Sequence, residues 1–373
     1  MKVAIVCDWL TNVGGAEKVL LQIHRLYPDA PIYTSKYAPK KIDWFEDADV
    51  RTGWLQIFPV FTRRFLGLFR QRWFEKLDLS EYDLIISVTG AEAKAVRATK
   101  PGAKHISYCH VPTQYYWQMY DTYVKDPGFG FLNPLVRFFF KLLVKPLRAR
   151  DFEAAQKVDE FITISEYAKE LILQYYKREA TVIHPPVETD KFKENHGGER
   201  DFKTFFPNTY YITTSRQVNW KRLDLAVKAC IKMNRELLVV GEGPEHHKLV
   251  KMSQNASNVK FSPLLGREEL ATYLAGAKGY LFPSMEPFGI APVEALASGC
   301  PVIAFKKGGA LDYIEEDKNG VFFDEQTVLS LVEAMKKFEK MKFERSEITK
   351  SAAGFSVERF DREIKEFVDG KTK

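Results

Sequence analysis

Short apolar runs alternate with helix-like amphipathic segments along the whole chain, and this alternation constrains the fold more than any other feature. A strand that is apolar on both sides must be covered by helices on both faces of its sheet. The pattern therefore predicts an α/β fold with parallel sheets. The expected strands are KVAIVCD, YDLIISV, KHISYCH, EFITIS and TVIHPP in the first half, and YYITTS, ELLVVGEG, VKFSPLL, GYLFPS and PVIAFK in the second.

The length predicts two domains. At 373 residues the chain is too long for one ordinary open α/β domain and fits two of about 150 to 200 residues. The segment HPPVETDKFKENHGGERDFKTFFPN, rich in Pro, Gly and charge, separates the two sets of strands. We expect one domain over 1–185, a second over 186–355, and a helix at 356–373 that packs on either domain, with the first as the candidate.

The cysteines and the N-terminus bear on the compartment. Four cysteines, Cys7, Cys109, Cys230 and Cys300, lie in apolar surroundings without metal-ligand spacing, which favours buried thiols in a reducing compartment. The run MKVAIVCDWL stops at Asp8 and lacks the features of a secretory signal. No window reaches the ~18 apolar residues that a spanning helix needs. We therefore expect a cytoplasmic protein that meets a membrane, if at all, from one side.

Two glycines follow the first expected strand. Gly14 and Gly15 stand at the entry of an amphipathic helix, where free N–H groups suit an anion. A tight strand-to-helix turn explains the same pair. The spacing is not G-x-G-x-x-G, and no acidic ribose partner follows about 20 residues on, which disfavours a nicotinamide cofactor.

Two cations follow the first strand of the second half. Arg216 and Lys221 lie at the expected carboxyl end of YYITTS, where a guanidinium and an ammonium can neutralise a diphosphate. The alternative is a pair of solvated surface cations.

The stretch EPFGIAPVE places two carboxylates around a flexible turn and the start of a helix. The backbone N–H groups of Phe288, Gly289, Ile290 and Ala291 suit a phosphate. Glu294 then suits the vicinal hydroxyls of a ribose, and Glu286 the hydroxyls of a sugar beyond the phosphates. For Glu294 alone, a carboxylate favoured by the helix dipole is the common alternative.

These motifs, together with SRQVNWKRLD, VVGEGP and GCPVIAFKKGG, resemble the retaining glycosyltransferases of family 4. The resemblance implies the GT-B fold, in which two Rossmann-like domains face each other across a cleft. The segment SYCHVPTQYYWQMYD, Ser107 to Asp121, is similar more narrowly to mannosyltransferases of O-antigen and related polysaccharide assembly. It implies transfer of a hexose, mannose from GDP-mannose in the first place, to a lipid-linked glycan.

The resemblance also implies residue roles. Gly15, with Gly14 beside it, would approach the diphosphate of the donor, and His110, which by itself is more often a structural residue, would face the donor sugar. Arg216 and Lys221 would grip the diphosphate, Glu294 would hold the ribose, and Glu286 would bind the sugar. The implied reaction retains anomeric configuration and uses neither a metal ion nor a cofactor, the nucleotide sugar being a substrate.

A basic, aromatic stretch in the first domain suggests a membrane contact. Between Arg51 and Lys76 there are six cations and one carboxylate. Its central arginines are Arg63, Arg64, Arg70 and Arg72, and VRFFFKLLVKPLRAR repeats the theme. Such a surface can lie on an anionic bilayer and deliver a lipid-linked acceptor. A helix that covers the core with snorkelling cations is an equal alternative.

Other classes fit less well. A nucleic-acid binder is suggested by the pI of 8.8, but no binding motif is present and the paired glutamates would have no role. A GT-B sugar-nucleotide epimerase or hydrolase, and a transferase with another donor and a soluble acceptor, stay open.

Overall fold

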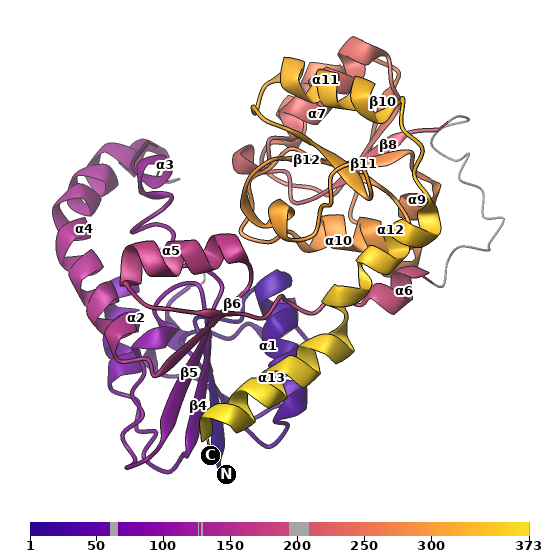
Figure 1. The fold of residues 1–373 in the computed structure, drawn as a ribbon. Coiled ribbons are helices and arrows are strands. Elements are labelled where there is room, and N and C mark those ends of the chain that lie inside the picture. Colours follow the sequence, from indigo (N-terminus) through magenta and orange to yellow (C-terminus); the bar gives the residue numbers. More distant parts are fainter. Residues whose placement is uncertain (60–65, 126, 128–129, 194–208, 373) are drawn as a thin grey trace. The chain divides into compact units, whose positions relative to one another are not determined.

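The computed structural model describes residues 1–59, 66–125, 127, 130–193 and 209–372. The chain divides into two compact units (Figure 1). Unit 1 comprises Met1–Pro185 and Phe360–Lys373, and unit 2 comprises Pro186–Arg359.

Unit 1 is built on a seven-stranded parallel sheet with the order β3-β2-β1-β4-β5-β6-β7. Apolar residues alternate between its two faces, so both faces must be covered. The strands are β1 (Val3–Cys7), β2 (Ile32–Thr34), β3 (Val50–Arg51), β4 (Leu84–Thr89), β5 (Lys104–Cys109), β6 (Glu160–Thr163) and β7 (Thr181–Val182).

Helices cover both faces of this sheet. The α-helices of unit 1 are α1 (Gly15–Leu26), α2 (Gly67–Glu75), α3 (Tyr120–Lys125), α4 (Asn133–Gln156), α5 (Glu166–Tyr176) and α13 (Val357–Thr372). Phe74 of α2 and Ala154 of α4 share a buried cluster with Val6 and Ile85 of the sheet. On the other face, Phe360 of α13 lies 5.9 Å from the ring of Tyr108. The short 3₁₀ helices are η1 (Pro39–Lys41), η2 (Trp54–Ile57), η4 (Ala93–Ala95) and η5 (Gly130–Leu132).

Helix α13 returns the chain to unit 1. Its residues Phe360, Ile364 and Val368 are buried at helical spacing, which is the pattern of an amphipathic helix on a core. The amide of Gln22 in α1 donates to Asp361 at 2.7 Å and fixes the two helices side by side.

Unit 2 contains a six-stranded parallel sheet with the order β10-β9-β8-β11-β12-β13. Its strands are β8 (Tyr211–Thr214), β9 (Leu237–Val240), β10 (Val259–Ser262), β11 (Gly279–Phe282), β12 (Val302–Phe305) and β13 (Gly320–Phe323). The helices α7 (Leu223–Met233), α8 (His246–Ser253) and α11 (Val328–Phe338) pack on one face over Leu237, Val239 and Leu281. The remaining helices are α6 (Thr189–Lys193), α9 (Arg267–Gly276), α10 (Ile290–Ala297), α12 (Arg345–Ser351), η7 (Asn219–Lys221), η8 (Gly308–Asp312) and η9 (Ala353–Phe355).

The predicted α/β class with two parallel sheets is confirmed, and all ten expected strands occur. Within the described residues, the strands that the pattern did not predict are β2, β3 and β13, of which β2 and β3 have only three and two residues. The four cysteines are free and buried, as expected. In the part of the chain that the structure describes, every helix is too short or too polar to cross a bilayer.

Candidate functional site

The order of the strands in unit 2 reverses between β8 and β11, which marks a place for a ligand. In open α/β sheets, ligands bind outside the carboxyl ends of the strands at such a switch point. The Tyr280 hydroxyl on β11 donates to the Thr214 carbonyl at 2.9 Å and lies 3.2 Å from the Thr214 amide. This contact ties the ends of the two strands together, and the predicted donor residues follow them in sequence.

The loop that bears Glu286 is held by its main chain. The Gly309 amide donates to the Glu286 carbonyl at 2.9 Å, and the Tyr313 hydroxyl donates to the Phe288 carbonyl at 2.9 Å. Gly308 has φ +74°, and a Cβ there would lie 2.3 Å from the Glu286 carbonyl oxygen. The glycines of the KKGG motif therefore let one loop approach the other closely and fix the backbone of Glu286.

Lys221 and Glu286, which the sequence assigned to neighbouring parts of one donor, lie together. The Lys221 ammonium is 2.5 Å from the Glu286 carboxylate. The Ser284 hydroxyl donates to the same carboxylate oxygen at 2.8 Å. Both charged side chains are about one-fifth exposed, at 19% and 20%. Because an ammonium has three donors, Lys221 can keep this pair and still bind a phosphate oxygen.

Glu294 is the fifth of the eight residues of α10, and its charge acts on Tyr280. Burial raises the pKa of Tyr280, and the carboxylates of Glu286 and Glu294 raise it further. Gly289 precedes the helix with φ +95°, and a Cβ there would lie 2.7 Å from the Phe282 ring. The N–H groups at the start of α10, at Ile290 and Ala291, have no acceptor within the helix, so an anion is favoured there.

Arg216 lies on the same side of unit 2, but its side chain extends into solvent. It is exposed, with its guanidinium 5.8 Å from the centre of the Trp220 ring. The next residue, Gln217, is buried and lies 2.9 Å from the His246 imidazole, which links the loops after β8 and β9. The backbone beside Arg216 is thus fixed, while its charge faces solvent.

In unit 1, the Asp8 side chain connects the carboxyl ends of β1 and β4. Its carboxylate accepts hydrogen bonds from the Thr89 hydroxyl at 3.0 Å and from the amides of Gly90, Ala91 and Ala93 at 2.9, 3.0 and 2.7 Å. Burial raises the pKa of Asp8, and the Glu92 carboxylate raises it further. The bonds fix the turn that follows β4.

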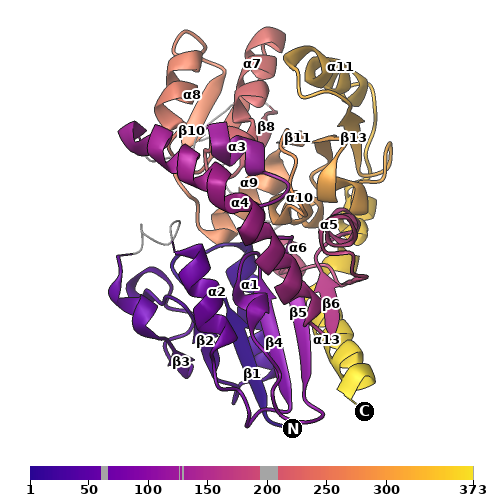
Figure 2. The same cartoon turned by 90° about the vertical axis from the view of Figure 1, so that its left-hand side faces the viewer.

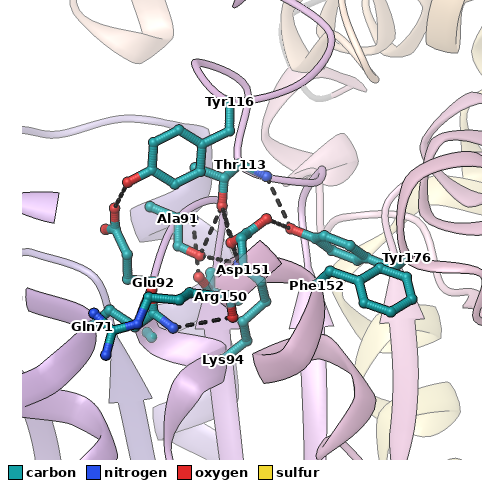
Figure 3. Close-up of polar contacts among 12 residues, drawn as sticks. Gln71, Ala91, Glu92, Lys94, Thr113, Tyr116, Arg150, Asp151, Phe152 and Tyr176 are labelled. Atoms are coloured by element: carbon teal, nitrogen blue, oxygen red, sulfur yellow. Dashed lines mark hydrogen bonds and ion pairs between the residues drawn. The ribbon is translucent and has the colours of Figure 1, made fainter. Parts of the chain in front are cut away.

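A buried ion pair lies next to this turn (Figure 3). The Lys94 ammonium is 2.6 Å from the Asp151 carboxylate of α4, and the two side chains are 1% and 2% exposed. Asp151 also accepts from the hydroxyls of Thr113 and Tyr176, both at 2.8 Å. The Trp117 ring donates to the same carboxylate at 2.7 Å. This network fixes the loop after β5 to α4.

The membrane role predicted for Arg70 is wrong. Arg70 is 3% exposed and pairs with the buried Glu92 at 2.8 Å, so its charge cannot face a bilayer. Arg72 is exposed on the same helix, α2. Arg63 and Arg64 lie outside the described residues. The exposed part of this stretch includes Trp54, Ile57 and Phe69.

The remaining predicted site residues belong to the carboxyl edge of the unit 1 sheet. Gly14 has an extended backbone, with φ −163°, and Gly15 is exposed in the first turn of α1. His110 directly follows β5, and its Nε2 has no hydrogen-bond partner among the described residues. Burial lowers the pKa of His110 to about 4, so the ring is neutral at neutral pH. A neutral imidazole can exchange hydrogen bonds with a hydroxyl.

We expect the stability of unit 1 to fall as the pH falls from about 6.5 toward 4. Burial lowers the pKa of His105 to about 4, below the unfolded value of about 6.5, so the unfolded chain binds more protons in this window. At pH 5, the difference in proton binding at His105 alone should lower the free energy of unfolding by about 2 kcal/mol relative to neutral pH. Urea unfolding at both pH values checks this, with His105→Gln as the variant. A pH dependence that the variant leaves unchanged would contradict the assignment.

Sequence reasoning missed the buried polar groups of unit 1, namely Lys94, Glu92, Asp151 and the role of Asp8. One signal was available. The segment GAEAKA, which contains Glu92 and Lys94, follows a strand and is otherwise made of small residues. Charged residues among small residues directly after a buried strand indicate buried charges, which require ionic partners elsewhere in the chain.

Two parallel-sheet units of this kind form the GT-B fold. Residues 13–191 match the family model described as Glycosyltransferase Family 4, and residues 199–354 match the one described as Glycosyl transferases group 1. The chain thus has the architecture and the two sequence domains of a GT-B glycosyltransferase.

A solved structure has the same fold. The structure of the Anabaena protein HepE in complex with UDP is 20% identical, covers 99% of this chain and 100% of its own, and superposes with a TM-score of 0.72.

Two curated relatives differ in their named donors. The GtfA subunit of a UDP-N-acetylglucosamine–peptide N-acetylglucosaminyltransferase from Streptococcus pneumoniae is 29% identical over 45% of this chain and 35% of its own length. A GDP-mannose-dependent alpha-(1-6)-phosphatidylinositol monomannoside mannosyltransferase from Mycobacterium tuberculosis is 27% identical over 41% and 45%. The chain spans about half, or less, of the length of the first curated relatives it matches.

Proposed function

We propose that this chain is a retaining, metal-independent glycosyltransferase that moves a hexose from a nucleotide sugar. The observation that carries the proposal is the Lys221–Glu286 pair, at 2.5 Å, on the loops that follow the switch-point strands β8 and β11. A cation for a diphosphate and a carboxylate for sugar hydroxyls lie there side by side, just ahead of the start of α10.

The chemistry follows from charge. As the bond from the sugar to the diphosphate breaks, negative charge grows on the departing nucleoside diphosphate. Lys221, Arg216 and the N–H groups at the start of α10 stabilise that charge, which lowers the barrier. Glu286 accepts hydrogen bonds from the transferred sugar, and Glu294 accepts them from the ribose hydroxyls.

We also assign donor contacts to two residues of unit 1, His110 and Gly15. The neutral imidazole of His110, whose Nε2 has no partner in the described part of the chain, serves as a hydrogen-bond partner for a sugar hydroxyl. Gly15, exposed where α1 begins, serves as a backbone contact for the diphosphate.

We propose mannose from GDP-mannose as the donor and a lipid-linked glycan as the acceptor, with the protein on the inner face of a membrane. The segment from Ser107 to Asp121 supports mannose, and the name of the mycobacterial relative supports a GDP-mannose donor and a lipid acceptor. The second candidate is a UDP-linked sugar, favoured by the name of the streptococcal relative.

The test is incubation with radiolabelled GDP-mannose and, separately, with UDP-linked sugars, in the presence of bacterial lipid extract. Transfer of label from GDP-mannose to a lipid product is the expected result. Transfer from a UDP sugar would replace the donor. Isomerised or hydrolysed donor without transfer would identify an epimerase or hydrolase and overturn the proposal.

We expect Arg216→Ala to weaken binding of the preferred nucleoside diphosphate about 10- to 100-fold, because a hydrogen bond to a charged group contributes about 1.5 to 3 kcal/mol. Isothermal titration calorimetry measures the affinity. Arg235→Ala is the matched control, since Arg235 precedes β9 at the opposite edge of the sheet and pairs with Glu339. Equal affinities in parent and Arg216→Ala protein would refute the phosphate role of Arg216.

A further inference from the structure

The amino-terminal half of α4 exposes a continuous apolar stripe. Its large side chains recur at the spacing of one helix face, the pattern that normally faces a core. Here that face is open to solvent. The exposed fractions are 56% for Leu135, 63% for Phe138, 49% for Phe139, 62% for Leu142 and 45% for Leu143. Exposed apolar patches of this kind mark interaction surfaces.

This part of α4 is a fixed element and not a frayed end. On its inner side, the Phe140 ring lies 5.5 Å from the Tyr120 ring of α3, and Val144 is 5% exposed. Arg137 donates to the carbonyls of Val124 and Lys125, both at 2.8 Å. Figures 1 and 2 both show α3 alongside this end of α4. The apolar stripe is therefore the side of the helix that unit 1 does not use.

The charge around the stripe has one sign. Between Gly130 and Arg150 the sequence has five cations and no Asp or Glu. Two of the cations, Lys141 and Lys145, are exposed. At about 100° per residue they fall on one border of the stripe, next to Phe138.

We propose that this face of α4, defined by Leu135, Phe138, Phe139, Leu142, Leu143, Lys141 and Lys145, docks on an anionic lipid bilayer. The aromatic and aliphatic side chains enter the interface, and the lysines contact acidic headgroups. A second copy of the chain fits less well, because a two-fold contact would set the lysine border against a face without carboxylates. The inference extends the proposed function by naming the surface that meets the membrane of a lipid-linked acceptor, and it replaces Arg70 in that role.

The test is flotation of the full chain with vesicles of phosphatidylglycerol and phosphatidylcholine, without donor or acceptor. Phe138→Ser/Phe139→Ser/Leu142→Ser should lower vesicle binding roughly 100-fold or more, since each side chain contributes apolar burial. Lys141→Gln/Lys145→Gln should lower it about 30-fold, about fivefold for each lysine. Pure phosphatidylcholine vesicles should bind the parent more weakly.

Matched controls distinguish vesicle binding through this face of α4 from nonspecific binding through other exposed side chains. Leu264→Ser/Leu329→Ser removes two exposed leucines of unit 2, and Lys40→Gln/Lys41→Gln removes two exposed lysines of η1. Both should float as the parent does. Calorimetry with GDP and UDP tests the donor site separately, and the α4 variants should keep the parent's affinity. Flotation of the triple variant like the parent, or a parent that ignores anionic vesicles and dimerises through α4 in light scattering, would overturn the inference.

Discussion

Replacing Asp151 by alanine is expected to lower the free energy of unfolding by about 3 to 5 kcal/mol, because it leaves the buried Lys94 ammonium without its partner. Burial is the largest single effect and by itself would lower the pKa of Lys94, but the neighbouring groups, of which Asp151 acts most strongly, together raise it, so the lysine is charged in the folded protein. The same variant also removes the acceptor of Thr113, Tyr176 and Trp117. Urea unfolding at neutral pH, followed by circular dichroism, measures the change.

A neighbouring carboxylate supplies the control. Glu153 is exposed on the same helix, so Glu153→Ala should change stability by only a few tenths of a kcal/mol. In the double variant Lys94→Met/Asp151→Leu, neither charge of this pair is left buried without its partner, and much of the loss should be recovered. If the Asp151→Ala protein unfolds at the same urea concentration as the parent, the Lys94 ammonium does not depend on Asp151 as its partner. The proposed contribution of the pair to the stability of unit 1 would then be wrong.

The fold was predictable because its signal is local. A strand such as Leu84–Thr89, buried at every position, appears as a mainly apolar run in which the only polar residues are the small Ser87 and Thr89. The short strand Val50–Arg51 at the sheet edge has one half-buried and one exposed residue, so its pattern does not differ from that of a loop. β13 is mainly apolar but begins at Gly320, the last residue of the turn-rich segment EEDKNG, so only a short apolar run is left to indicate a strand.

The common position of Lys221, Glu286 and the start of α10 was predictable, since all three follow strand ends that a parallel sheet brings to one edge. Their roles toward a donor were implied by the resemblance and stay a prediction. Their mutual pairing was not predictable, because the 2.5 Å contact depends on how the KKGG loop positions the backbone of Glu286. That contact links residues far apart in the chain.

Arg70 and α4 show the limit of amphipathic patterns. In both segments cations alternate with aromatic residues, and the sequence does not specify which side of the helix faces the core. In α2, Arg70 points inward because Glu92 neutralises it there. In α4, the apolar stripe points outward because Phe140 and Val144 already fill the inner side. The partner that decides the direction lies elsewhere in the chain in each case.

We expect Glu286→Ala to lower the turnover of sugar transfer about 100-fold while leaving nucleoside diphosphate affinity nearly unchanged or slightly raised. A lost hydrogen bond from a charged group to the transferred sugar accounts for the turnover, at about 1.5 to 3 kcal/mol. The affinity is kept because Lys221, freed from its partner, can give all three donors to phosphate oxygens. The backbone of residue 286 should stay in place, since the Gly309 amide holds it by its carbonyl.

One further variant separates charge from shape at position 286, and a second tests the proposed ribose contact. Glu286→Gln keeps the size of the side chain and an acceptor for the Ser284 hydroxyl but loses the charge, so its turnover should fall between those of the parent and Glu286→Ala. Glu294→Ala should lower nucleoside diphosphate affinity more than it lowers turnover, because its proposed contact is to the ribose. Glu347→Ala, on the exposed side of α12, is the matched control. Single-turnover transfer assays and calorimetry give the two quantities independently. Glu286→Ala protein that transfers sugar at the parent's rate would show that the carboxylate beside Lys221 serves only to hold that lysine, and the sugar contact would have to be sought elsewhere in the chain.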